Sequence, residues 1–168
     1  MKKITIIISL FLLVLLVSGC EEKKNVTING KTVNTAKMEH KHCTRNGSLT
    51  GGEVELEYDV YYTGDNINIV KTMEKVISDD QEILNTYEEA YKGIHSHYEG
   101  LENYETSVVR DNNSVASYIN VNYDEVDIDK LIAIEGEEDN IFENKVPKVS
   151  KWLELGEKLG AQCELVED

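Results

Sequence analysis

The stretch EVELEYDVYYTGDNINIVKTMEKVI, residues 53–77, decides the fold. Across residues 53–62, apolar side chains alternate with mostly acidic ones, which predicts a strand with one buried face and one wet face. Residues 63–66 are a strong turn signal, because Gly64 and its polar neighbours suit a tight reversal of the chain. A second strand is predicted over residues 67–77. The two strands together predict an antiparallel hairpin.

Further strands are predicted on both sides of this hairpin. Residues 38–45 form a candidate first strand. Residues 104–110 and 115–123 flank a polar turn at residues 111–113, so they predict a second hairpin. A last short strand is predicted over residues 161–166.

Three helices are predicted between and after these strands. Ser78 and Gln81 have the form of a capping box for a helix that ends near Tyr98. Its apolar stripe has helical spacing and consists of Ile83, Tyr87, Ala90, Tyr91, Ile94 and Tyr98. Asp127 is the predicted cap of a short helix, and Pro147 suits the first turn of a final one.

These elements predict an α+β domain. Hairpin signals dominate, and strands do not alternate with helices as they do in a parallel sheet. We therefore expect an antiparallel sheet of about five to six strands with two to three helices packed on one face. The single domain is predicted to span residues 38–168. Residues 20–37 are polar and predict a flexible tether, with a weak strand near residues 26–28.

The N-terminal residues have the features of a secretory signal. Lys2 and Lys3 precede an apolar run at residues 4–17, and small residues follow it. The run has about 14 residues, whereas a membrane-spanning helix, the alternative, needs roughly 20. The sequence Ser-Gly-Cys at residues 18–20 resembles the lipobox of a bacterial lipoprotein signal. This resemblance implies that residues 1–19 are removed and that the thiol of Cys20, the new N-terminus, carries a diacylglyceryl group.

The chain is strongly acidic. Its net charge is −15, and removal of residues 1–19 takes away two lysines and no acid, which brings the charge to −17. Such a charge repels the phosphates of nucleic acids, so no nucleic acid partner is expected. It also repels an anionic membrane surface, and its plainest effect is solubility.

Two cysteines remain if Cys20 carries lipid. An even pair in an oxidising compartment favours a disulfide between Cys43 and Cys163, which would join the first predicted strand of the domain to the last. Two free thiols and a metal site are the alternatives.

His40 and His42 are the candidate metal ligands. On a strand they share one face and can hold one zinc or copper ion, whereas Cys43 points to the opposite face. His95 and His97 lie on a predicted helix, where residues two apart point about 200° apart, so at most one of them can join. Ordinary surface or half-buried histidines remain the competing interpretation.

No catalytic signature is present in the sequence. It lacks the nucleophile elbow, the zinc-protease motif, the phosphate loop and the dinucleotide fingerprint. We therefore expect a protein that is not an enzyme and has no cofactor. Its expected role is that of a binding module at the cell envelope, and the alternative is a small-ligand or metal-binding lipoprotein that uses His40 and His42.

The chain is similar to the YehR-like lipoproteins, a bacterial family without an established function. The similarity rests on the lipobox at Cys20, the strand and turn at residues 53–65, the segment 121–124 leading into 128–131, and the final helix before Cys163. It implies a small α+β lipoprotein that is anchored by lipid on the extracytoplasmic face of the cell membrane. It transfers no catalytic or binding residues. The expected partner is an envelope protein or a small ligand.

Overall fold

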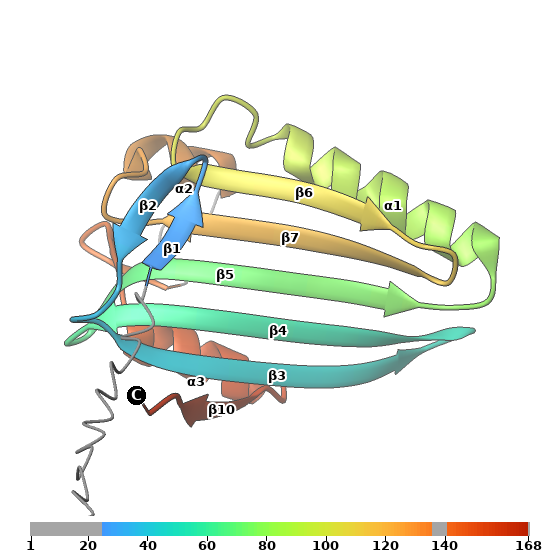
Figure 1. Ribbon diagram of the computed structural model, residues 1–168, viewed down its shortest axis with the longest axis horizontal. Coiled ribbons are helices and arrows are strands. Elements are labelled where there is room, and N and C mark those ends of the chain that lie inside the picture. The colour runs from blue at the N-terminus through green and yellow to red at the C-terminus, as the bar shows by residue number, and fades with distance from the viewer. Residues whose placement is uncertain (1–24, 136–140, 168) are drawn as a thin grey trace, which may run out of the picture.

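The computed structural model describes residues 25–135 and 141–167, and a six-stranded antiparallel sheet runs through them (Figure 1). The strand order is β10–β3–β4–β5–β7–β6. The strands are β3 (Glu39–Leu49), β4 (Gly52–Thr63), β5 (Asn66–Ile77), β6 (Tyr104–Arg110), β7 (Ser114–Asn122) and β10 (Gln162–Leu165). The hairpin predicted over residues 53–77 is therefore confirmed, and it lies at the centre of the sheet.

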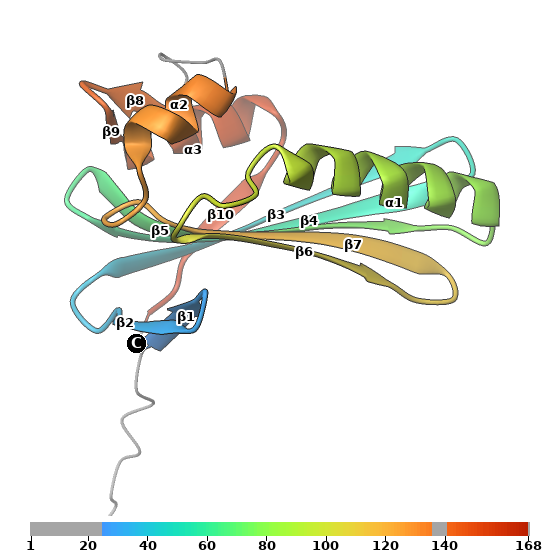
Figure 2. The same cartoon turned by 90° about the horizontal axis from the view of Figure 1, so that it is seen from above.

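The helices of the described chain all lie on one face of this sheet (Figure 2). They are α1 (Gln81–Ser96), α2 (Ile128–Glu135) and α3 (Val149–Lys158). The α+β class, the antiparallel sheet and the one-sided helix layer are thus confirmed. Two short strands, β8 (Phe142–Glu143) and β9 (Val146–Pro147), pair with each other between α2 and α3.

The folded part begins earlier than the sequence analysis predicted. Residues assigned to the tether form a hairpin of β1 (Asn25–Ile28) and β2 (Lys31–Asn34), which lies on the face opposite the helices (Figure 2). Val26 and Ile28 are buried against Ile69 of β5. The missed signal is the pair Asn29 and Gly30, whose φ angles of 49° and 75° suit the tight turn that joins two such strands.

The apolar core on the helix face consists of separate clusters. Between α1 and the sheet, Leu84 and Tyr91 of the helix form a cluster with Val76 and Val115. Between α3 and the sheet, Val149 of the helix forms a cluster with Val60, Tyr62, Ile67 and Val70. A third cluster, near α2, contains Leu101, Tyr104, Val121, Val126, Leu131, Ile132 and Phe142. Each helix therefore covers its own part of the sheet. Each large apolar side chain that is fully buried there stabilises the folded state by about 1.5–3 kcal/mol.

The first turn of α1 differs from the predicted capping box. The cap is Asp80, whose carboxylate accepts a hydrogen bond of 2.8 Å from the backbone N–H of Glu82. Ser78 lies two residues earlier, where its hydroxyl donates to the carbonyl of Gly51 at 2.6 Å and accepts from the backbone N–H of Asp80. Ser78 therefore fixes the entry to the helix, and the acidic residue caps it.

Two further details of the helices differ from the prediction. The buried face of α1 contains Leu84, Tyr91 and His95, whereas Ile94 from the predicted stripe is 50% exposed. The final helix begins at Val149, because Pro147 belongs to β9 and pairs with Phe142. Tertiary contacts decide both the buried face of α1 and the first residue of α3. Local periodicity does not contain these contacts.

Candidate functional site

The proposed lipid site, Cys20, lies outside the described residues. Among the described residues, no helix combines the length and apolar character needed to cross a bilayer. The remaining candidate residues, Cys43, Cys163, His40 and His42, all lie on β3 or β10 at one edge of the sheet.

Cys43 and Cys163 are joined by a disulfide with a sulfur–sulfur distance of 2.04 Å. The two residues are direct partners in the antiparallel ladder between β3 and β10. Cys43 is fully buried. The bond therefore ties the last strand, which has only four residues, to a long strand near the start of the fold.

His40 and His42 lie on the other face of β3, and the structure brings both to Asp59 of β4. The Nε2 atom of His40 is 2.9 Å from Oδ1 of Asp59, and Nδ1 of His42 is 3.0 Å from the same oxygen. A carboxylate oxygen only accepts, so each imidazole donates its N–H to this shared acceptor. A metal ion bound at these same two nitrogens would have to replace both hydrogen bonds.

Two effects act on the ionisation of Asp59. Burial raises the pKa of the carboxyl, but the hydrogen bonds from His42 and His40 together with the charges of the two imidazoles outweigh it, so the pKa lies below its usual value. Tyr61 stacks on the ring of His40 with the ring centres 4.2 Å apart and also packs against the β1–β2 hairpin. The histidine pair is thus held from two sides by ordinary packing and hydrogen bonding.

The other histidine pair lies elsewhere. His95 is buried on the helix face, where its Nε2 is 2.9 Å from the hydroxyl of Ser117, and this burial lowers the pKa of the imidazole. The sheet therefore separates His95 from His40 and His42. Within residues 25–135 and 141–167, no three histidine, cysteine, aspartate or glutamate side chains gather in a metal-binding arrangement.

A polar row lies between α1 and the centre of the sheet. The hydroxyl of Tyr91 donates to Glu74 at 2.9 Å, and Glu74 is the direct ladder partner of Ser117, which contacts His95. Burial, followed by the charge of Glu74, raises the pKa of Tyr91. The same two causes raise the pKa of Tyr58. Glu74 was not predicted from the sequence, although it has the same parity along β5 as the inward-facing Val76.

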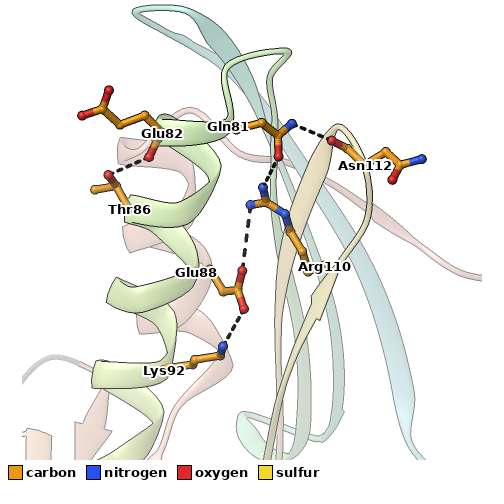
Figure 3. A network of polar contacts seen from close by, with 7 residues as sticks. All are labelled: Gln81, Glu82, Thr86, Glu88, Lys92, Arg110 and Asn112. Atoms are coloured by element: carbon orange, nitrogen blue, oxygen red, sulfur yellow. Dashed lines mark hydrogen bonds and ion pairs between the residues drawn. The ribbon is translucent and has the colours of Figure 1, made fainter.

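A second polar network joins α1 to the hairpin of β6 and β7 (Figure 3). Arg110 donates through Nη2 to Oε1 of Gln81 at 2.7 Å, and Gln81 donates to the carbonyl of Asn112 at 2.8 Å. Glu88 accepts from Lys92 and lies 4.0 Å from Nη1 of Arg110. The single carboxylate of Glu88 therefore lies between two cations, Lys92 and Arg110.

A surface depression of about 500 Å³ lies at the start of β6. The residues that line it include Glu99, Glu102, Glu105, Tyr98 and Tyr104. The two rings stack with their centres 4.3 Å apart. The depression is therefore acidic, with an aromatic wall.

Comparison with solved structures identifies the fold. The chain is similar to the NMR structure of the YehR protein of E. coli, with a TM-score of 0.54, 17% identity, and coverage of 79% of this chain and 94% of that chain. It is also similar to the NMR structure of a protein from Streptococcus pneumoniae TIGR4, with a TM-score of 0.52, 13% identity, and coverage of 80% and 89%. No family model and no curated protein matches the chain. Identities this low establish the fold alone, and that fold is YehR-like.

Proposed function

We propose that this chain is a lipoprotein of the cell envelope, anchored to the membrane by lipid on Cys20, with its folded body outside the cytoplasm. By the same proposal it belongs with the YehR-like lipoproteins and acts as a binding or interaction module, not as an enzyme. The lipobox at residues 18–20 and the YehR-like fold both support this assignment.

The observation that carries the proposal is the disulfide between Cys43 and Cys163. Disulfides persist in oxidising compartments and are rare in the cytosol of most organisms. Of the three cysteines in the sequence, the two that the lipid does not need are the two that pair. The chemistry of the folded body and the N-terminal signal therefore favour the same compartment.

The arrangement of layers supports a binding role. The helices cover one face of the sheet, whereas the small β1–β2 hairpin covers only one end of the other face (Figure 2). Val109 and Tyr118, on the open part of that face, are 47% and 37% exposed. Exposed apolar and aromatic side chains on a rigid sheet are suited to contact a partner.

The test compares the native protein with Cys20→Ser in its own host. We expect the native protein to take up a labelled fatty acid and to fractionate with membranes, and Cys20→Ser to lose both properties. Alkylation of intact cells without reductant should leave Cys43 and Cys163 unmodified. A native protein found in the cytosol with residues 1–19 attached would overturn the proposal. Crosslinking in intact cells, followed by mass spectrometry, then identifies the partner.

A further inference from the structure

The strand β6 forms one edge of the sheet, and its hydrogen-bonding register shows which backbone groups face outward. Asn103 accepts from Asn122, and Asp111 donates to Ser114, so these two pairs bracket the ladder between β6 and β7. In an antiparallel ladder, alternate residues bond to the partner strand. The odd-numbered residues of β6 therefore bond to β7, and the even-numbered residues turn their N–H and C=O groups away from the sheet.

Part of this outer edge is already used within the fold. The carbonyl of Tyr104 accepts a hydrogen bond of 3.3 Å from the side chain of Asn29, in the turn between β1 and β2. No residue of the described chain bonds to the backbone of Thr106, Val108 or Arg110. Their outward-facing groups recur roughly every 7 Å, which is the spacing that an added strand requires.

The helix α1 and the depression at the start of β6 both border this edge. The helix α1 runs alongside β6 (Figure 1) and lies on the helix-bearing face (Figure 2). Glu88 and Lys92 extend from α1 toward β6 (Figure 3). The depression with Glu99, Glu102 and Glu105 lies at the start of the same strand.

The charges at this edge favour a cationic segment over a second copy of the chain. Within the described residues, no lysine or arginine forms an ion pair with the three carboxylates of the depression. Glu105 accepts a hydrogen bond of 3.1 Å from Asn120, which leaves Glu99 and Glu102 for a cationic ligand. In a second copy of the chain, the cations along this edge already have partners: Lys92 pairs with Glu88, Arg110 donates to Gln81, and Lys31 pairs with Glu125. Two copies of the mature chain, each with a net charge of −17 once residues 1–19 are removed, also repel each other.

We propose that the edge of β6 binds an extended, lysine- or arginine-rich segment of another envelope protein by strand addition. The backbone of the segment pairs with Thr106, Val108 and Arg110, and its cationic side chains reach the acidic depression. This inference rests on the proposed function in its cellular setting, because it names the partner of the envelope module. The binding itself is a property of the folded domain and is measured apart from localisation.

The experiment measures fluorescence anisotropy of a labelled peptide that alternates lysine with valine, against the full mature protein in phosphatidylcholine nanodiscs. A matched peptide with glutamate in place of lysine is the charge control. Thr106→Pro removes an outward N–H from the edge, and Thr106→Val changes the side chain but keeps that N–H. Edge strands tolerate proline where the N–H faces solvent.

A second pair of variants tests the acidic depression. Glu99→Lys with Glu102→Lys reverses its charge, and Glu157→Lys with Glu164→Lys makes the same change in net charge at the opposite edge of the sheet. The first pair should weaken binding of the basic peptide by about tenfold or more, and the second by about threefold at most, because salt screens distant charges.

Binding of the basic peptide that Thr106→Pro and the Glu99/Glu102 reversal both weaken supports the proposal. Three results overturn it: no measurable binding of the basic peptide, equal binding of the acidic peptide, or unchanged binding to Thr106→Pro with a native unfolding midpoint. Self-association that Thr106→Pro abolishes would also overturn it, because the edge would then belong to a second copy. If Thr106→Pro does not fold, the two charge-reversal pairs decide.

Discussion

Reduction of the disulfide between Cys43 and Cys163 should lower the stability of the domain by a large and calculable amount. The bond closes a loop with a sequence separation of 120 residues. In the chain-entropy model, a loop of that length destabilises the unfolded state by about 5 kcal/mol at 25 °C. For a domain of this size, such a loss lowers the melting temperature by roughly 10–20 °C.

The assay is urea unfolding of the purified protein, with and without reductant, followed by circular dichroism and by the fluorescence of Trp152. The control is the double variant Cys43→Ala with Cys163→Ala, whose unfolding midpoint should not respond to reductant. Native-state hydrogen exchange adds a local test. On reduction, the amides of the four-residue β10 should lose protection before those of β4 and β5, because β10 pairs only with β3.

A difference below about 1 kcal/mol between the oxidised and reduced proteins would refute this reasoning. Intact mass after alkylation without reductant distinguishes the two ways in which it can fail. If both thiols are modified, the bridge is absent. If neither is modified, the bridge is present but does not restrict the unfolded chain as the model assumes.

Three further predictions concern single side chains. Asp80→Ala removes the hydrogen bond to the backbone of Glu82 at the start of α1 and should destabilise the domain by about 1 kcal/mol in urea unfolding; an unchanged midpoint would exclude the capping role. Burial lowers the pKa of His95, so the unfolded chain binds the proton more readily, and stability should fall as the pH drops below about 6.5. His95→Gln should remove that part of the pH dependence, and a pH profile identical to that of the native protein would contradict this. Asp59→Ala removes the acceptor that two imidazoles share and should destabilise the domain by about 1–2 kcal/mol at neutral pH, whereas Asp59→Asn keeps an acceptor and should lose less. Because the pKa of Asp59 is lowered, its stabilisation is complete above about pH 4 and is lost as the pH falls further, which acid unfolding of the native protein and Asp59→Ala will show.

Most of the sheet could be predicted because strand periodicity is a local property. In β4, the alternating residues Leu56, Val60 and Tyr62 are buried, and the turn at Gly64 and Asp65 reverses the chain into β5. Of the hairpin of β1 and β2, only a weak strand near residues 26–28 was predicted, because its pattern is short. Its four-residue strands are too short for a clear pattern, and only the contact of Val26 and Ile28 with Ile69 makes them part of the fold.

The faces of the helices were less predictable, because the position of the sheet determines them. The periodicity of α1 fits several stripes that differ by a small rotation. The sheet lies on the side of Leu84 and His95, and this leaves Ile94 in solvent. Burying His95 is tolerated because Ser117 supplies a hydrogen-bonding partner on β7, a contact that no local pattern contains.

Some features of the candidate site could be predicted from the sequence, and others depend on long-range contacts. The pairing of Cys43 with Cys163 followed from counting cysteines, and the shared face of His40 and His42 followed from strand parity. That Asp59 holds both imidazoles depends on the register of β3 against β4, which brings His42 directly opposite Asp59. Register is a long-range property, so the sequence indicated the two histidines but not their common partner.

The early start of β1 at Asn25 limits how far the domain can stand from the bilayer. If the lipid is on Cys20, only residues 21–24 separate it from the first residue of β1. Five residue steps of fully extended chain reach at most about 17 Å, roughly two screening lengths at physiological salt. With lipid on Cys20, the acidic body would thus be held near the headgroups despite its charge.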